Sequence, residues 1–402
     1  MRRDRPFEAV LEEAVTQLDH ADRRLAHEIA AGVLRTRDEL DGQITPLVSG
    51  DWRRTPADLK DLLRIGAYQV LRLSRVPGYA AVQTTVEVAK GVAGARGARL
   101  VNAVLRRLVD GIARGETTAS TTDLAGRYSH PAWLVDRWIE RYGTHETEAL
   151  LRHNNERPRL VLQPARQTVD QLQAALTAEA VPFHDAPLGA GLVVEARRVL
   201  GLPGFEAGAF IVQDPAQARL VQFAAIPENS VVWDACAAPG GKAVLLSHGC
   251  RRVIASDNRR DRAARLKETV TRAAAGVSLL LADACRPPIR AGSIDVVVVD
   301  APCSATGTMA RHPDARWRLS PRRLARLVQL QAQILDGVAA TLRPAGLLVY
   351  MTCSLEPEEN EEQVDRFLER RSDFRREGDD LFIFPPDAGT DGGYGTRLRR
   401  VA

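Results

Sequence analysis

The second half of the chain is a series of short apolar segments rich in β-branched residues, with helical segments between several of them. The segments carry the strings VVWDAC, RVIASD, VSLLLAD, IDVVVVDAP and GLLVYMTC. Strands that are buried on both faces of a parallel sheet have this composition. The pattern predicts a doubly wound α/β domain over residues 211–402, with ligands bound beyond the carboxyl ends of its strands.

The first part of the chain carries no strand signal. Apolar residues recur at helical spacing in four segments, residues 22–35, 57–74, 81–90 and 100–109. An all-α bundle followed by a polar linker is therefore expected over residues 1–123. Residues 124–210 mix helical and strand-like signals and are predicted to form a small α/β connecting module.

Composition excludes several classes of protein. The 402 residues contain no apolar run long enough to span a membrane, and the N-terminal residues do not resemble a signal peptide, so a cytoplasmic protein is expected. The cysteines form no CxxC pair, which argues against a zinc cluster or a disulfide framework. A cysteine that matters here is expected to be a reactive thiol. The five cysteines are Cys236, Cys250, Cys285, Cys303 and Cys353.

The basic residues are nearly all arginines. The net charge of +4 is compatible with a polyanionic partner but does not require one. Only four of the 55 basic residues are lysines, so a lysine such as Lys242 is expected to have a specific role. Six arginines and one acid between residues 311 and 326 predict a phosphate-binding face, with a solvated helix face as the alternative.

Polar residues follow the predicted strands where a nucleoside could bind. Gly240 and Gly241 permit close backbone approach to a ligand before a probable helix, whose first turn offers free amide donors. The turn is not GxGxxG, which argues against a nicotinamide cofactor. Asp257 suits a ribose diol, and Asp283 suits an adenine edge. Together with Asp234 and Asp300, these carboxylates predict a nucleoside-shaped site.

The string CAAPGGK, at residues 236–242, resembles the cofactor motif of the RNA 5-methylcytosine methyltransferases of the RsmB/NOP type. The resemblance implies a Rossmann-like methyltransferase domain that binds S-adenosylmethionine. It assigns the cofactor contacts to Cys236, Ala237, Ala238, Pro239, Gly240, Gly241, Lys242, Asp257, Asp283 and Asp300.

Methylation of cytosine at carbon 5 requires a nucleophile, because this carbon does not attack a sulfonium methyl unaided. A thiolate that adds to carbon 6 makes carbon 5 enamine-like. Cys303 in DAPCSATG and Cys353 in TCSLEPEENE both end predicted strands, and both strings resemble motifs of the family. The resemblance implies that Cys353 is the nucleophile and that Cys303 assists release of the methylated base. It also places Asp300 near the cytosine, with Lys242 either orienting Asp300 or polarising the base.

Further motifs in the first part of the chain extend the resemblance to nearly the whole chain. The strings RRLAHEIAAGVLR, LLRIGAYQVLRLSRVP, AAVQTTVEVAK and RLVNAVLRRL are similar to the helical RNA-binding domain of the antitermination factor NusB. A plain packing bundle is the alternative.

One departure from the family lies near the C-terminus. A single aromatic residue, Tyr394, follows Asp391-Gly392-Gly393 here, whereas the family has two aromatic residues after Asp-Gly. The acidic residues at 358, 359, 361 and 362 are expected to cap and solvate the next helix.

The resemblance implies an enzyme that methylates carbon 5 of a cytosine in RNA, most simply 16S ribosomal RNA. The expected protein is a monomer with an RNA partner, no metal and no membrane association. A transfer RNA methyltransferase is the alternative within the same class. A non-catalytic RNA-binding antitermination or assembly factor is the alternative from another class, and the presence of Lys242, Asp300, Cys303 and Cys353 argues against it.

Overall fold

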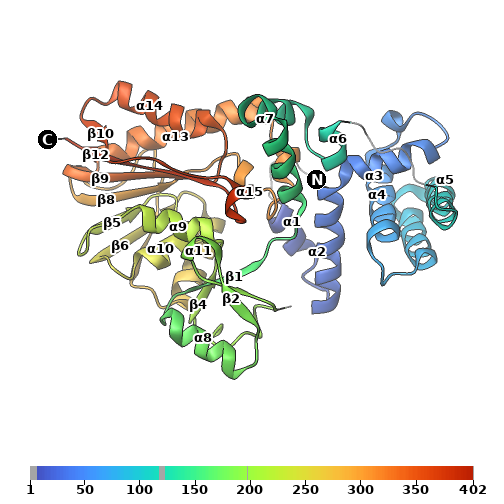
Figure 1. Cartoon of the computed structure of the whole chain (residues 1–402), viewed down its shortest axis with the longest axis horizontal. Helices are drawn as coiled ribbons and strands as arrows, with labels where there is room; N and C mark the ends of the chain where they lie inside the picture. The colour runs from blue at the N-terminus through green and yellow to red at the C-terminus, as the bar shows by residue number, and fades with distance from the viewer. Residues whose placement is uncertain (1–6, 117–122, 197, 402) are drawn as a thin grey trace. The chain divides into compact units, whose positions relative to one another are not determined.

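The computed structural model describes residues 7–116, 123–196 and 198–401, which fall into two compact units (Figure 1). The first unit holds the described residues up to Glu156 together with the distant segment Met309–Arg318. The second unit holds Arg157–Thr308 and the described residues from Leu319 onward. Of the linker predicted at residues 111–123, positions 117–122 lie outside the described residues.

The first unit is helical, as the sequence predicts. Its core lies between helices α3, α4 and α5 and includes Ile44, Leu63, Val101 and Leu105. The two helices predicted at residues 81–90 and 100–109 are the arms of α5, which Gly94 kinks with a φ of +66°. The elements are α1 (Phe7–Ala14), α2 (His20–Arg35), α3 (Arg37–Ile44), η1 (Thr45–Leu47), η2 (Trp52–Arg54), α4 (Ala57–Arg72), α5 (Gly78–Ala113), α6 (Leu124–Tyr128), α7 (Ala132–Asn155) and α12 (Ala315–Arg318).

The second unit begins with a small antiparallel sheet of the order β2-β3-β1-β4. Helix α8 starts at a capping box, in which Thr168 and Gln171 each bind the other's backbone amide. Helix and strand are both present from Arg157 onward, whereas residues 124–155 of the predicted α/β module form α6 and α7 of the first unit. The elements are β1 (Leu160–Pro164), α8 (Val169–Ala178), β2 (Phe183–Asp185), η3 (Pro187–Gly189), β3 (Leu192–Val194) and β4 (Phe210–Val212).

The rest of the second unit is built on an eight-stranded sheet. Its strands follow the order β10-β12-β9-β8-β5-β6-β7, with β11 paired to β12. Strands β5 to β9 run parallel, and β12 is antiparallel to β9, so the five strands predicted from the sequence are all present. The strands are β5 (Val231–Asp234), β6 (Arg252–Asp257), β7 (Val277–Leu281), β8 (Ile294–Asp300), β9 (Leu342–Thr352), β10 (Phe374–Arg376), β11 (Leu381–Ile383) and β12 (Gly393–Arg400).

Helices cover both faces of this sheet (Figure 1). Residues such as Leu220 and Val244 pack on one face, and residues such as Leu335 and Phe367 pack on the other. The doubly wound α/β prediction is therefore confirmed. The elements between the strands are α9 (Pro215–Phe223), α10 (Gly241–Leu246), α11 (Arg260–Arg272), η4 (Thr306–Thr308), α13 (Pro321–Ala339), η5 (Pro357–Glu359), α14 (Glu361–Arg370) and α15 (Pro385–Ala388). Among the described residues, no helix has both the length and the hydropathy to cross a bilayer.

Candidate cofactor and cysteine site

The carboxyl ends of the parallel strands bring most of the predicted site residues to one edge of the sheet. Asp234, Asp257 and Asp300 are the last residues of β5, β6 and β8. Cys353 directly follows β9, which runs parallel to β8. Because parallel strands end at the same edge, these side chains share the position where ligands bind in open α/β sheets.

The loop from β5 to α10 contains the string CAAPGGK. Ala237 and Ala238 are buried against Leu266 and Val270 of α11, whereas Pro239 is exposed. Gly240 has a φ of +112°, and a Cβ atom there would lie 2.9 Å from the Leu266 side chain. Glycine is therefore required at this position by the fold itself. Burial raises the pKa of the Cys236 thiol, so this thiol is neutral at neutral pH.

Asp234 is a buried carboxylate beneath this loop. Its side chain is fully buried, and among the described residues neither carboxylate oxygen has a hydrogen-bond partner of normal geometry. Burial and the neighbouring charge of Asp300 raise the pKa of Asp234 to about 7, while Lys242 and the Cys236 amide oppose the rise. A buried polar group without partners is costly, so this carboxylate is suited to receive donors from a bound ligand.

Lys242 joins the cofactor loop to the end of β8. Its side chain is buried, and Nζ donates to Oδ2 of Asp300 at 2.7 Å and to Oε1 of Gln217 on α9. Two acceptors hold the ammonium in one place. The sequence did not predict that Gln217 binds Lys242, because this contact depends on the packing of α9 against α10.

Asp257 and Asp283 differ in their surroundings. Asp257 is buried, accepts from the Arg259 amide at 3.0 Å and pairs with Arg262 at 3.1 Å. Arg262 also donates to the carbonyl oxygen of Ala238 at 3.1 Å, so it links Asp257 to the CAAPGGK loop. Asp283 is exposed two residues beyond β7 and accepts from the Cys285 amide at 2.9 Å.

The two cysteines of the predicted chemistry are neighbours. Their Sγ atoms lie 3.2 Å apart, although 50 residues separate them in sequence. The amide of Gly307 donates to the Cys353 carbonyl at 3.0 Å, which ties the two cysteine loops together. The contact with Cys353 and burial raise the pKa of Cys303 well above its usual range, so Cys303 is a neutral thiol at neutral pH.

Glu359 departs from the expectation for the acidic run after Cys353. The sequence predicts that these glutamates cap and solvate a helix, but Glu359 is fully buried and accepts hydrogen bonds from Ser304 and Gln331. Burial raises its pKa, and the hydrogen bonds from Ser304, Ser354 and Gln331 oppose the rise. Serine directly after each cysteine is the one sequence signal that points to this network.

The arginine-rich segment from 311 to 326 is not a single phosphate-binding face, so this prediction was wrong. Arg316 is fully buried in the helical unit, where it donates to the Asn155 side chain at 2.7 Å and to the Asn154 carbonyl at 2.9 Å. Arg318 pairs with Asp314 at 2.6 Å. Of the six arginines, Arg322 and Arg326 are exposed, and the other four are buried or half-buried.

The departure from the family near the C-terminus is accommodated by close packing. A Cβ atom on Gly393 would lie 2.9 Å from the Leu220 side chain, so the position has little room for a larger residue. The remaining aromatic residue, Tyr394, is buried and donates to Asp380 at 2.5 Å. The Gly392 amide donates to the Gly307 carbonyl at 2.7 Å, which places this segment beside the Cys303 loop.

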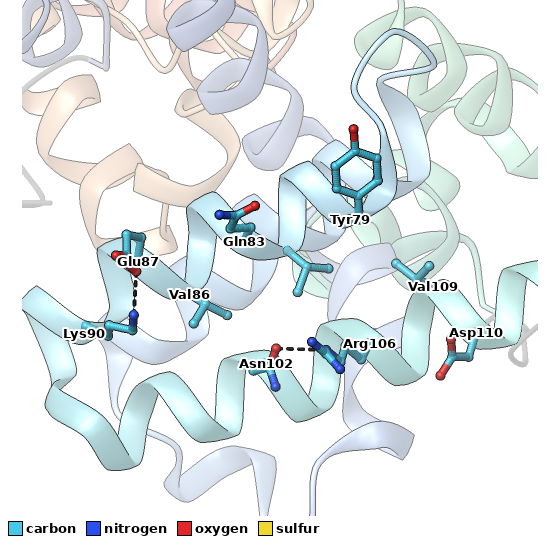
Figure 2. A pocket seen from close by; sticks show the side chains of 10 residues that line it. Tyr79, Gln83, Val86, Glu87, Lys90, Asn102, Arg106, Val109 and Asp110 are labelled. Atoms are coloured by element: carbon cyan, nitrogen blue, oxygen red, sulfur yellow. Dashed lines mark hydrogen bonds and ion pairs between the residues drawn. The ribbon is translucent and has the colours of Figure 1, made fainter.

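The helical unit carries a separate groove between the two arms of α5 (Figure 2). The groove has a volume of about 630 Å³, and Tyr79 at its rim is 75% exposed. Lys90 pairs with Glu87 at 2.7 Å, and Arg106 donates to Asn102 at 3.1 Å. The other residues that line the groove are Val82, Gln83, Val86, Val109 and Asp110.

Two solved structures have a similar fold. A crystal structure of PH0851 covers 97% of this chain and 93% of its own, with a TM-score of 0.82 and 22% identity. The structure of NSun6 from Pyrococcus horikoshii with SFG covers 68% of this chain and 98% of its own, with a TM-score of 0.59 and 19% identity. At these identities the likeness supports the fold.

Family models and curated relatives identify the family of the chain. The model of the 16S rRNA methyltransferase RsmB/F family matches residues 221–385, the NusB family model matches residues 2–110, and the ferredoxin-like domain of RsmF/B-like methyltransferases matches residues 130–198. Ribosomal RNA small subunit methyltransferase B of Vibrio cholerae is 35% identical over 95% of this chain and 90% of its own length. The same protein of Enterobacter sp. (strain 638) is 36% identical over 87% of this chain and 83% of its own. By this similarity over nearly its whole length, the chain belongs to the ribosomal RNA small subunit methyltransferase B family.

Proposed function

We propose that this protein transfers a methyl group from S-adenosylmethionine to carbon 5 of a cytosine in 16S ribosomal RNA. The observation that carries the proposal is the contact of Cys303 with Cys353 at the carboxyl edge of the sheet, beside the Lys242–Asp300 ion pair. The relatives of the chain are named as ribosomal RNA small subunit methyltransferases, which supports the same substrate.

The residues at the strand ends fit S-adenosylmethionine, which supplies an electrophilic methyl group when bound. The cofactor carries an amino group and a ribose diol, and both can donate hydrogen bonds. Asp234 offers a buried carboxylate that lacks a partner of normal geometry among the described residues, and Asp257 offers a second buried carboxylate at the next strand. We assign the cofactor contacts to residues 236–242 with Asp257, Asp283 and Asp300.

The proposed reaction uses the two cysteines in order. The Cys353 thiolate forms a bond to carbon 6 of the cytosine, and the electron density that this addition places on carbon 5 enables methyl transfer. A base then takes the proton from carbon 5, the electron pair of that C–H bond forms the double bond to carbon 6, and the bond from carbon 6 to sulfur breaks so that Cys353 departs as a thiolate. We assign Cys303 to this release, Asp300 to contact with the cytosine ring, and Lys242 to holding Asp300.

The helical unit is proposed to help select the RNA. Its groove has an exposed aromatic ring, Tyr79, at one end, and two cationic side chains, Arg106 and Lys90, line it further along (Figure 2). Aromatic rings stack on unpaired bases, and cations contact phosphates. We further propose that the protein acts as a monomer in the cytoplasm without a metal ion. Transfer RNA is the alternative substrate, and the experiment must distinguish it from ribosomal RNA.

Bisulfite sequencing of ribosomal and transfer RNA from a deletion strain tests the substrate. The expected result is loss of one methylated cytosine in 16S ribosomal RNA, restored by the wild-type gene and not by Cys353→Ala. Loss of a methylated cytosine in transfer RNA alone would overturn the ribosomal assignment.

A denaturing gel tests the order of the cysteines. Cys353→Ala should abolish both methylation and the covalent protein–RNA band, because no other route to carbon 6 remains. Cys303→Ala should form the band and fail to resolve it. Cys250→Ala, which removes a cysteine outside the site, is the control and should behave as wild type. If Cys353→Ala accumulates the band and Cys303→Ala does not, the roles are reversed.

A further inference from the structure

We propose that Glu359 is a positioning residue that holds the Cys303 loop against Cys353 and thereby speeds release of the methylated base. The inference rests on the proposed function, in which Cys303 serves release. It assigns a role to a buried carboxylate that the reaction scheme above does not use.

Glu359 and Gln331 bind the backbone on both sides of Cys303. The amide of Ser304, the residue after Cys303, donates to Oε1 of Glu359 at 2.9 Å and to Oε2 at 3.2 Å. The carbonyl of Pro302, the residue before it, accepts from Gln331 Nε2 at 3.0 Å. The same Gln331 nitrogen donates to Glu359 at 2.9 Å, so one connected pair of side chains fixes both neighbours of the cysteine.

The same network reaches the loop of Cys353. The Ser304 hydroxyl donates to Glu359 and lies 3.0 Å from the hydroxyl of Ser354, the residue after Cys353. Thr306 accepts from the Leu355 amide at 2.8 Å. The two loops are therefore joined through the residues that follow each cysteine, and the carboxylate of Glu359 lies at the centre of these contacts.

Glu359 is itself held firmly in place. Its carbonyl oxygen accepts from the Tyr350 hydroxyl at 2.7 Å, and Tyr350 is fully buried in the core of the sheet. A carboxylate is costly to bury unless donors satisfy it, and here the donors come from the residues that shape the cysteine loop. The carboxylate thus links the Cys303 loop to η5, which Tyr350 of β9 holds through the Glu359 carbonyl.

The position of Cys303 should depend on this anchor, because Glu359 and Gln331 bind the residues on both sides of the cysteine. Without the carboxylate, the Ser304 amide and hydroxyl lose their acceptor, and the backbone next to Cys303 is held less tightly, although the Gly307–Cys353 and Thr306–Leu355 hydrogen bonds still join the two loops. Cys353 would still add to carbon 6, because its own backbone follows β9 directly. Loss of Glu359 should then resemble loss of Cys303. The loss of a hydrogen bond to a charged group corresponds to a change of about tenfold or more in a rate. Release of the methylated base should slow by this factor, and the covalent adduct should accumulate accordingly.

The experiment uses the full-length protein, 16S ribosomal RNA and S-adenosylmethionine, with Glu359→Ala, Glu359→Gln and the exposed control Glu369→Gln. Glu359→Ala should accumulate the covalent protein–RNA band about tenfold over wild type and slow turnover, with unchanged cofactor affinity. Glu359→Gln retains an acceptor for the Ser304 amide and should return the band toward the wild-type level. Glu369→Gln should match wild type. Slow turnover of Glu359→Ala without accumulation of the band would overturn the proposal.

Two further variants cover the case in which Glu359→Ala does not fold. Gln331→Leu and Ser304→Ala each remove part of the same network, and each should accumulate the band severalfold. If neither does, the proposal is wrong. Cys303→Ala is run in parallel to separate the two hypotheses. If the covalent band accumulates with Cys303→Ala but not with the Glu359, Gln331 and Ser304 variants, the role of Glu359 is overturned and the role of Cys303 stands. If the band does not accumulate with Cys303→Ala, both roles are overturned.

Discussion

The ammonium of Lys242 donates to Oδ2 of Asp300 across 2.7 Å, joining the first turn of α10 to the end of β8. Lys242→Met should leave Asp300 unpaired beside the buried Asp234. Removal of one partner from a largely buried ion pair destabilises a protein by about 3 kcal/mol. Urea unfolding of the variant, with the exposed Lys267→Met as the control, measures this difference. Equal free energies of unfolding would show that the ion pair contributes nothing to stability.

Asp257→Ala should raise the dissociation constant for S-adenosylmethionine about tenfold or more, because a hydrogen bond to a charged acceptor is worth roughly 1.5–3 kcal/mol. Calorimetry on the folded variant measures the change. Asp261→Ala is the matched control, since it removes an exposed carboxylate of α11 that pairs with Arg259, the residue before this helix. An unchanged affinity in Asp257→Ala would refute the ribose assignment.

The buried Asp234 should make stability depend on pH. Its pKa is about 7 in the folded protein and near 3.8 in the unfolded chain, so the folded state binds the proton more tightly. The contribution of Asp234 to stability is therefore present below pH 4 and is lost as the pH rises to about 7. Each pKa unit corresponds to about 1.4 kcal/mol, so the full loss is at most about 4 kcal/mol.

Asp234→Asn removes this titration. Relative to wild type, the variant should gain free energy of unfolding as the pH rises from 4 to 7, and the difference should stay constant above that range. Denaturant unfolding of the cofactor-free proteins at several pH values measures the difference. A difference that is flat from pH 4 to 7 would contradict the raised pKa.

The buried Arg316 should stabilise the helical unit rather than bind RNA. Arg316→Met fills most of the space but leaves the Asn154 and Ser129 carbonyls without this donor, so stability should fall by about 1–3 kcal/mol. The exposed Arg322→Met should be neutral for stability. Thermal melting compares the two variants, and equal melting temperatures would contradict the assignment of Arg316 to the core.

The groove on α5 should contribute to RNA affinity. Tyr79→Ala removes a base-stacking surface worth about 1–3 kcal/mol, so RNA should bind about tenfold more weakly, with cofactor affinity unchanged. Val92→Ala, an exposed substitution on the same helix outside the groove, is the control. Filter binding with 16S ribosomal RNA measures the change. Point variants are preferable to deletion of residues 1–110, because a deletion would also remove the packing partners of Met309–Arg318.

The sequence predicted those features that depend on local pattern. The strands of the sheet are apolar and β-branched because both of their faces are buried, and the aspartates that follow them stand at one edge for geometric reasons. The burial of Glu359 and Arg316 could not be predicted from local pattern. Each lies in a run of like charges that is typical of a solvated surface, and the donors and acceptors that permit burial come from distant residues, Ser304 for Glu359 and Asn154 for Arg316.

The inclusion of Met309–Arg318 in the helical unit has a consequence for synthesis of the protein on the ribosome. Residues up to Glu156 emerge first, yet the buried guanidinium that binds Asn154 and Asn155 is translated much later. The nascent helices must wait, with these polar groups hydrated, until residue 318 has left the exit tunnel. The packing of the N-terminal unit therefore cannot be completed before most of the methyltransferase sequence has been synthesised.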